Sequence, residues 1–327
     1  MGKTTKSKSV MPQTVTHKKT PFLSYFKSHY WLYILIIPGV AYMLCFNYLP
    51  MLGLVMAFQD FNPFNGDGVI GAFVHSPWVG FDVFEEFIFG YDFKMVLVNT
   101  LSISILSLIF YFPAPIILSL LLNEIKSQGY KRVTQTLVYI PHFISMVIVA
   151  SLTLQLFSTT DGIVYQLMAA VVGRDNVPDL LSDPKLFKVL IVGQNIWKET
   201  GYGTIIFLAA LSGVDQEQYE AARVDGAGRW RLMWHITLPA IRGTIVIMLI
   251  LKVGQILNTG FEQIYLMQNA LNRSASETFD TYIYRIGIQQ SDYSMGAAAG
   301  MFKSIVSLIM VLGANKVAKM CGESGFY

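Results

Sequence analysis

The chain has 327 residues, of which 53% are hydrophobic and only 14% are charged, whereas about 25% of the residues of an ordinary soluble domain are charged. This composition excludes a typical soluble protein, and the collection of apolar residues into long uncharged runs predicts an all-α integral membrane protein. The formal net charge of +3 is too small to indicate nucleic-acid binding, and two cysteines, Cys45 and Cys321, are too few for a disulfide framework or a metal cluster.

Six apolar stretches qualify, in whole or in part, as membrane-spanning helices, each of which needs about 20 mostly apolar residues. The first three contain no Asp, Glu, Lys or Arg, whereas the other three each hold between one and three charged residues. They lie at residues 31–58, 95–122, 136–157, 186–211, 243–267 and 295–315. We therefore predict a six-span transmembrane domain over residues 31–315.

Lys and Arg are distributed unevenly among the segments that flank these spans. The N-terminal tail, the second and fourth connections and the C-terminal tail carry 15 of them, and the opposite side carries five. Short cytoplasmic loops are enriched in Lys and Arg. For a protein of the cytoplasmic (inner) membrane, the pattern predicts cytoplasmic tails at residues 1–30 and 316–327 and a cytoplasmic loop at residues 212–242.

The loop at residues 212–242 looks unlike a simple linker. Its first half predicts a helix over 216–224 with an acidic N-cap, stopped at Gly226. Its second half predicts a helix over 229–237 that ends at Pro239. One side of this second helix is expected to carry Trp230, Met233 and Trp234. Two short helices bent at a glycine suit either a docking knob for another protein or an amphipathic element on the lipid surface.

A spaced motif runs through the same loop. Glu220-Ala221-Ala222 is followed after three residues by Gly226 and after nine more by Ile236-x-Leu-Pro. This spacing resembles the EAA loop of ABC-importer permeases, and the wider run resembles the permeases for oligosaccharides. The residues that match the motif or lie within it are Glu220, Ala221, Ala222, Asp225, Gly226, Ile236, Leu238 and Pro239.

Other segments are similar to a subgroup of these permeases that imports complex saccharides, of which alginate is one. These segments are Tyr48-Leu49-Pro50, Phe58-Gln59-Asp60-Phe61-Asn62-Pro63, Ser76-Pro77-Trp78-Val79-Gly80-Phe81 and Gly322-Glu323-Ser324-Gly325. The resemblance therefore extends over nearly the whole chain.

The resemblance implies a set of partners. Permeases of this type pair with a second permease subunit, usually as a heterodimer, and each EAA loop binds a cleft on one of two cytoplasmic ATPase subunits. An extracytoplasmic solute-binding protein delivers the oligosaccharide. ATP and Mg²⁺ would be held by the ATPase, so we expect no cofactor, metal or catalytic site on this chain, which also lacks a G-x-x-x-x-G-K-[ST] sequence. Transport would proceed by alternating access.

Polar residues occur at helical spacing inside two of the predicted spans. Charged and amide side chains in a bilayer usually face a cavity or another helix, so these sets are candidates either for the substrate pathway or for interhelical hydrogen bonds. The fifth span holds Lys252, Gln255, Thr259 and Glu262, and the fourth holds Gln194, Trp197, Lys198 and Tyr202. Four Lys against two Glu within the spans favour an acidic sugar, such as a uronate oligosaccharide, over a neutral one.

Two other classes of protein compete with this interpretation. A secondary transporter driven by an ion gradient would use intramembrane carboxylates such as Glu199 and Glu262, but no inverted repeat is detectable and the EAA spacing argues against it. A membrane enzyme is disfavoured because the five histidines are scattered and the sequence has no G-x-S-x-G elbow.

Overall fold

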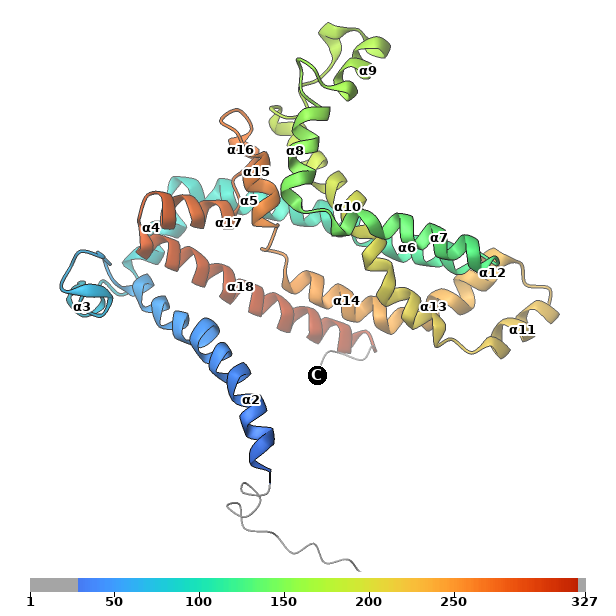
Figure 1. Ribbon diagram of the computed structural model, residues 1–327, viewed down its shortest axis with the longest axis horizontal. Coiled ribbons are helices and arrows are strands. Elements are labelled where there is room, and N and C mark those ends of the chain that lie inside the picture. The colour runs from blue at the N-terminus through green and yellow to red at the C-terminus, as the bar shows by residue number, and fades with distance from the viewer. Residues whose placement is uncertain (1–28, 323–327) are drawn as a thin grey trace, which may run out of the picture. The chain divides into compact units, whose positions relative to one another are not determined.

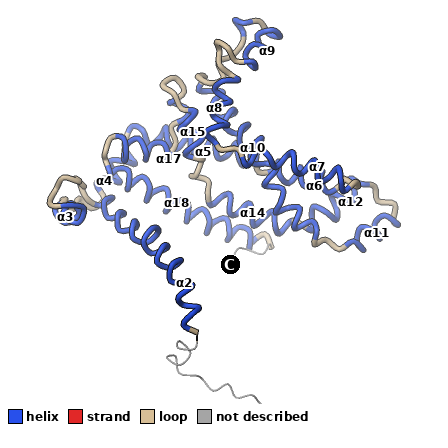
Figure 2. Tube along the Cα trace, in the orientation of Figure 1, coloured by secondary structure: helices blue, strands red, loops and turns tan. Residues whose placement is uncertain are grey.

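The computed structural model describes residues 29–322 of a chain that divides into two units, Met1–Gly53 and Leu54–Tyr327. Figure 2 shows helices and loops throughout the described residues, with one isolated bridge between Gln59 and Trp78. The all-α prediction is therefore confirmed for this part of the chain. The predicted N-terminal tail up to residue 28, and residues 323–327 of the predicted C-terminal tail, lie outside the described residues.

The first unit contributes α2 (Tyr30–Met43) and the π-helical turn η1 (Leu44–Tyr48). The tight helix η2 (Leu49–Phe58) follows without a break in helical structure and passes into the second unit. Together they form a 29-residue apolar helix, Tyr30–Phe58, which is long enough to cross a membrane. This helix agrees with the predicted span at 31–58.

The first half of the second unit contains one long helix and one sharply bent pair of helices. Residues Tyr91–Asn123 form a continuous apolar helix of 33 residues, which covers the predicted span at 95–122. In chain order the elements are α3 (Gly68–His75), α4 (Asp82–Phe89), α5 (Tyr91–Leu106), η3 (Ser107–Tyr111), α6 (Pro113–Asn123), α7 (Gln128–Tyr139), η4 (Ile140–Phe143), α8 (Met146–Leu156), α9 (Ile163–Val172) and η5 (Arg174–Asn176).

The second half begins and ends with long helices and is irregular between them. In Figure 1, α10 runs along α6 and α14 runs along α18. In chain order the elements are α10 (Pro184–Ser212), α11 (Gln216–Val224), α12 (Arg229–Leu232), η6 (Met233–Thr237), α13 (Leu238–Ala240), α14 (Arg242–Gly254), α15 (Phe261–Met267), α16 (Arg273–Ser276), α17 (Phe279–Ile283), η7 (Tyr284–Gln289) and α18 (Tyr293–Met320).

Two predicted spans are not single helices. The stretch at 136–157 bends by 91° between Phe143 and Met146, because the chain leaves helical geometry at Ile144 and restarts with Ser145 as the N-cap of α8. The stretch at 243–267 is a helix only to Gly254 and resumes at Phe261.

Length and composition identify three helices of the described chain as candidate spans, or five if each bent pair counts as one. The three are Tyr30–Phe58, Tyr91–Asn123 and Tyr293–Met320. The bent pairs are Gln128–Phe143 with Met146–Leu156, and Arg229–Ala240 with Arg242–Gly254, the latter bent by 60°. The helix α10, with 29 residues, is also long enough to cross a bilayer.

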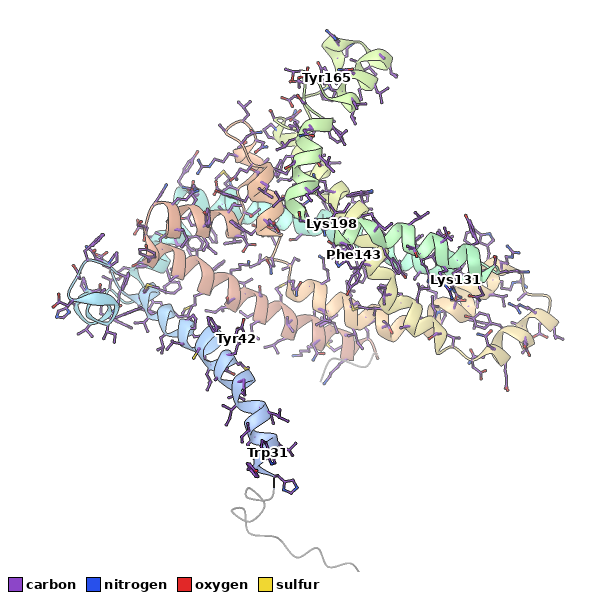
Figure 3. All side chains as sticks on the ribbon, in the orientation of Figure 1. Trp31, Tyr42, Lys131, Phe143, Tyr165 and Lys198 are labelled. Carbon is purple, nitrogen blue, oxygen red and sulfur yellow. The ribbon has the colours of Figure 1, made fainter. Side chains whose placement is uncertain are left out.

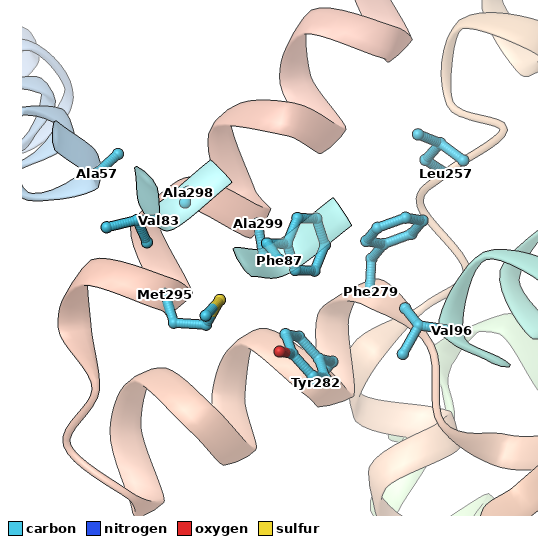
Figure 4. Close-up of a cluster of buried hydrophobic side chains, with 10 residues drawn as sticks. All are labelled: Ala57, Val83, Phe87, Val96, Leu257, Phe279, Tyr282, Met295, Ala298 and Ala299. Carbon is cyan, nitrogen blue, oxygen red and sulfur yellow. The ribbon is translucent and has the colours of Figure 1, made fainter. Parts of the chain in front are cut away.

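A cluster of buried aromatic and small side chains packs α4, α5 and α17 against α18 (Figure 4). Phe87 and Phe279 meet edge to face with ring centroids 6.3 Å apart, and both contact Phe302. Ala298 and Ala299 are fully buried, so the bulky rings approach the backbone of α18 closely. Aromatic pairs of this kind add about 0.5–1.5 kcal/mol each beyond the area that they bury.

A buried ionic network fixes the segment from α16 to η7 onto α5. Glu277 is 0% exposed, and its carboxylate accepts hydrogen bonds from Arg273 Nε at 2.7 Å and Arg285 Nε at 3.1 Å. Arg285 also donates to Asp92 at 2.9 Å. Burial lowers the pKa of Arg285, but the hydrogen bonds and charges of Asp92 and Glu277 outweigh burial and raise it above its ordinary value. Two guanidinium groups therefore compensate a carboxylate that would be costly to bury alone.

Helix α10 approaches the backbone of α7 most closely at Gly201. A Cβ atom at this position would lie 1.8 Å from the carbonyl oxygen of Val138, whereas at Gly193 on the same helix it would meet nothing within 4 Å. Only a residue without a Cβ fits between the two backbones at Gly201, so this glycine sets the distance between α10 and α7.

We expect Gly201→Ala to destabilise the protein by about 1–3 kcal/mol, because the backbone of α7 must shift to admit the methyl group. Gly193→Ala is the matched control, and it should be neutral or slightly stabilising because Ala favours a helix over Gly. Thermal unfolding in detergent, followed by tryptophan fluorescence, measures both. Equal melting temperatures for the two variants would contradict the packing described here.

Candidate functional site

A polar cavity of about 590 Å³ lies in the second unit between α10 and the two interrupted segments. Its walls come from the break between η4 and α8, the middle of α10, the end of α14 and the irregular turn before α15. The charged and amide side chains on these walls include Lys198, Glu199, Lys252, Gln255, Asn258 and Glu262. Non-helical backbone within an apolar helical region is tolerated where it lines a cavity, and both interruptions do so here.

The four residues predicted on one face of the fifth span all line the polar cavity. They do not share a helical face, however, because helical structure stops at Gly254 and Gly260 takes a left-handed conformation with φ +88°. The irregular turn between these glycines brings Gln255 and Thr259 to the cavity. The hydroxyl of Thr259 is buried and has no hydrogen-bond partner among the described residues.

The four residues predicted on one face of the fourth span are divided by the structure. Lys198 lines the polar cavity. Gln194 is buried behind it, where its amide donates to Thr153 Oγ1 at 2.6 Å and accepts from Gln263 Nε2 at 2.8 Å. Trp197 lines an apolar groove beside α8, and Tyr202 stacks on the ring of His142 with centroids 3.9 Å apart. Of this set, only Lys198 reaches the cavity.

Lys198 is the centre of a charged cluster at the break between η4 and α8. Its Nζ donates to the carbonyl oxygen of His142 at 2.9 Å and to Glu199 Oε1 at 2.8 Å. The other oxygen of Glu199 lies 2.7 Å from His142 Nδ1. Figure 3 shows Lys198 beside Phe143, the residue at which η4 ends. The ammonium thus caps a carbonyl that the interrupted helix leaves open, and Glu199 balances its charge.

The other lysines of the predicted spans differ in what they contact. Lys188 donates to Ser102 Oγ at 2.9 Å, and Lys303 forms an ion pair with Asp280. Lys252 lines the polar cavity, and its Nζ lies 5.1 Å from the centroid of the Tyr111 ring. This distance is short enough for a cation–π interaction. Within residues 29–322 Lys252 forms no ion pair with a carboxylate, so its positive charge is open to the cavity.

The loop at residues 212–242 folds as two helices joined at Gly226. The amide of Gly226 donates to Arg223 O at 3.0 Å, and that of Ala227 donates to Ala222 O at 2.9 Å. This pair of bonds is the Schellman pattern, which places a left-handed residue just after the helix. Gly226 has φ +79°, so the sequence places a glycine where the backbone requires one. Asp225 is the C-cap of α11.

The motif residues of this loop occupy two kinds of position. Glu220 and Ala221 are exposed, whereas Ala222 and Ile236 pack inside the loop against Tyr219 and Leu232. Leu238 packs against the cluster formed by α6 and α10. The hydroxyl of Tyr219 donates to Thr237 Oγ1 at 3.1 Å, which ties the first helix to the second. Part of the motif therefore builds the loop and part of it faces outward.

The second helix of the loop differs from the prediction in two respects. Pro239 does not end it, since α12, η6 and α13 run continuously to Ala240, and the π-helical geometry of η6 widens the turn that precedes the proline. Met233 packs against the α6–α10 cluster, so it does not share the exposed side on which Trp230 and Trp234 lie. A wider turn shifts the side chains that follow it around the axis.

Several polar residues of the cavity region were not predicted from the sequence. Asn195 and Asn258 line the cavity, and Gln263 holds Gln194 in place. His142 follows Pro141 at the end of a helix, and this pairing was a usable signal, because proline removes a backbone donor near the break. Groups of three or more His, Cys, Asp or Glu that could hold a metal ion do not occur in the described part of the chain.

The fold and the site together define a class of protein. The chain has apolar helices long enough to span a membrane, one of which contributes Tyr111 to a polar cavity, and a two-helix loop with an exposed acidic residue leads directly into α14, whose end lines that cavity. This arrangement is that of a membrane permease whose loop can engage another protein.

The sequence matches the family described as "Binding-protein-dependent transport system inner membrane component" over residues 111–319. Protein LplB of Bacillus subtilis is 50% identical over 316 residues, which is 97% of each chain. The polygalacturonan/rhamnogalacturonan transport system permease protein YteP of Bacillus subtilis is 47% identical over 297 residues, covering 91% of this chain and 90% of YteP.

Two solved structures are also similar. A chain in the crystal structure of a bacterial alginate ABC transporter in complex with an alginate pentasaccharide-bound periplasmic protein gives a TM-score of 0.83 at 37% identity, covering 93% of this chain and 99% of that chain. A chain in a bacterial ABC transporter involved in the import of the acidic polysaccharide alginate gives 0.82 at 39% identity, covering 91% and 98%.

The chain belongs to the family of binding-protein-dependent transport system inner-membrane components. It is a transport component of the membrane rather than an enzyme, and the resemblance to permeases that the motif spacing indicated is confirmed.

We expect Glu199→Gln to destabilise the protein by about 1.5–3 kcal/mol, the range for hydrogen bonds to charged groups, because the substitution leaves the Lys198 ammonium without its counterion. Glu262→Gln is the matched control, since Glu262 lines the same cavity, is exposed and forms no ion pair within the described residues. The melting temperature in detergent distinguishes them. A larger loss for Glu262→Gln would show that Glu199 does not stabilise the break.

Proposed function

We propose that this chain is the membrane-spanning permease subunit of an ATP-driven ABC importer for acidic oligosaccharides. The observation that carries the proposal is the polar cavity, in which Lys252 presents a positive charge without a carboxylate partner among the described residues. Amides and hydroxyls beside it supply the donors and acceptors that sugar hydroxyls need.

The proposed topology has six spans with both termini in the cytoplasm. Three long helices and the bent pair at residues 128–156 give four, α10 is the fifth, and the predicted span at 243–267, with α14 and α15, is the sixth. Its charged residues do not disqualify it, because Lys198 and Glu199 pair with each other and Lys188 is hydrogen-bonded to Ser102. The excess of Lys and Arg beside residues 212–242 supports a cytoplasmic position for that loop.

Acidic specificity rests on Lys252 rather than on a simple count of lysines. Of the four lysines within the predicted spans, only Lys198 and Lys252 line the polar cavity, and Glu199 neutralises Lys198. With Glu262 included, the cavity holds two Lys and two Glu, and the cation without an ion-pair partner among the described residues is Lys252. The relatives support an acidic sugar, because YteP is named for polygalacturonan and rhamnogalacturonan and the similar structures are of alginate transporters.

The loop at residues 212–242 is proposed as the coupling element that docks on a cytoplasmic ATPase subunit. Glu220 and Ala221 are exposed on its first helix, with Trp230 and Trp234 exposed on the second, and an aromatic knob of this kind buries well in a groove. A second permease subunit, two ATPase subunits that hold ATP and Mg²⁺, and an extracytoplasmic solute-binding protein complete the proposed complex. The structure of the alginate transporter with its periplasmic protein supports the last partner.

The first test removes the positive charge of Lys252. Lys252→Gln should reduce uptake of a uronate oligosaccharide by the reconstituted complex by about 10- to 100-fold, because a hydrogen bond to a charged group contributes about 1.5–3 kcal/mol. Uptake of a neutral oligosaccharide should change little. Lys188→Gln is the control, since Lys188 contacts Ser102 outside the cavity. Equal loss of acidic uptake in both variants would refute the role given to Lys252.

The second test addresses coupling. Glu220→Lys and Gly226→Asp should abolish transport and leave membrane insertion intact, because both change the outward side of the loop. A Cβ at Gly226 meets nothing within 4 Å in this chain, so the internal cost is the strain of a left-handed residue. Gln218→Lys, on another side of the same helix, should transport normally.

Affinity purification should recover an ATPase with the wild-type protein and lose it with Glu220→Lys. Normal uptake by either loop variant would overturn the coupling role.

Purification also discriminates against the remaining alternative. If the chain purifies alone and transports in liposomes on an ion gradient without ATP, a secondary transporter replaces the importer proposed here.

A further inference from the structure

A second polar pocket, of about 440 Å³, lies beside the loop at residues 212–242, where α6 and α10 end and α7 begins. It is bounded by the end of α6, the start of α7, the end of α10 and the inner side of α11 and α12. We call it the basic pocket because its charged lining consists of Lys126, Lys131, Arg223, Arg229 and Glu124. Figure 3 shows Lys131 at the end of α7 that lies near α12.

Four cations thus face one carboxylate around a common space. Within residues 29–322 the structure pairs none of these four cations with Asp or Glu. Two of them, Arg223 and Arg229, come from the two helices of the loop, whereas Lys126 comes from the connection between α6 and α7 and Lys131 from the first turn of α7. Like charges that converge without counterions repel one another, so the pocket is electrostatically suited to an anion.

The basic pocket is separate from the proposed docking face of the loop. On α11 its lining residues are Gln216, Tyr219 and Arg223, which follow at steps of three and four and so share one helical face. Val224 lies on the outer side of the helix and is 88% exposed, and Glu220, which is exposed but does not line the pocket, lies at the edge between the two sides. An ATPase bound to that outer side would leave the basic pocket accessible from the side of α7.

The basic pocket lies where two long helices end. The apolar helix Tyr91–Asn123 ends at the pocket, and α10 ends at Ser212, one residue after Leu211 of its wall. Basic pockets between helices on the cytoplasmic side bind phosphorylated headgroups.

We propose that the basic pocket binds a phosphate group, supplied either by an anionic phospholipid of the inner leaflet or by a soluble phosphoryl compound. Arg223 and Arg229 would provide planar donor pairs for phosphate oxygens and Lys131 a point charge. Because one phosphate would contact the start of α7 and both helices of the loop, its binding would stabilise the loop in the observed position. The inference uses the proposed topology only to name the leaflet.

The test compares two double variants with the same loss of charge at neighbouring positions. Lys131→Gln/Arg229→Gln removes two cations of the pocket, whereas Arg132→Gln/Arg231→Gln removes the adjacent cations that do not line it. The delipidated protein, with whatever subunits it retains, is mixed with phosphatidylglycerol or phosphatidylcholine, and bound lipid is measured by native mass spectrometry. Inorganic phosphate is tested in parallel by thermal stabilisation in detergent.

We expect the wild type and the Arg132/Arg231 variant to retain phosphatidylglycerol over phosphatidylcholine by at least about 10-fold, and the Lys131/Arg229 variant to lose this preference. Stabilisation by inorganic phosphate without lipid retention, lost in the same variant, would assign the site to a soluble phosphoryl compound. Identical behaviour of the two double variants, or no response to either probe, overturns the proposal. So does loss of a co-purifying ATPase from the Lys131/Arg229 variant with anion binding unchanged, since the pocket would then be a protein interface.

Discussion

An interrupted helix inside an apolar region leaves backbone carbonyls without partners, and the way in which this chain satisfies one of them determines much of its architecture. Lys198 donates to the carbonyl of His142 where η4 ends, and Glu199 supplies the counterion. The close approach at Gly201 brings α10 near enough for this bond. Since an unsatisfied backbone group in a bilayer costs several kcal/mol, the bend of 91°, the position of α8 and one wall of the polar cavity all depend on these few residues.

Helix α10 has one polar side and one apolar side. Toward the cavity, α10 presents Lys198 and Asn195. Toward α8 it presents Val189, Leu190 and Trp197, which line an apolar groove. Gln194 lies between the two and is held by Thr153 and Gln263, so an amide network seals the boundary. A helix with three charged residues is thereby compatible with an apolar surrounding, because Lys198 and Glu199 pair with each other and Lys188 is hydrogen-bonded to Ser102.

The sequence predicted continuous elements better than interrupted ones. Uniform apolar runs, such as those around residues 95–122 and 295–315, predict long helices from composition alone. The breaks at Ile144 and at residues 255–260 depend on tertiary hydrogen bonds, so hydropathy does not reveal them, although Pro141 and Gly260 were local signals. The sequence predicted that Lys252, Gln255, Thr259 and Glu262 share one helical face, and they do line the cavity, but through an irregular turn and not on a common face. Helical spacing grouped Trp197 with Lys198, whereas the structure places Trp197 in the groove beside α8. Spacing alone does not reveal which neighbouring element a helical face contacts. Gly226 was predicted correctly because its backbone requirement is local.

The helix α14 gives the proposed coupling a direct physical path. It begins at Arg242, immediately after the loop at residues 212–242, and ends at Gly254, just before the irregular turn that lines the cavity. At 1.5 Å per residue its 13 residues span about 20 Å, and it packs along α18 for support. A rigid helix transmits a displacement of the loop to Lys252 and Gln255 with little loss, whereas the non-helical turn at 255–260 can absorb the change in backbone angles. On the proposed mechanism, ATPase closure therefore moves the open cation of the cavity through one continuous element, and the interruption that follows it serves as the hinge.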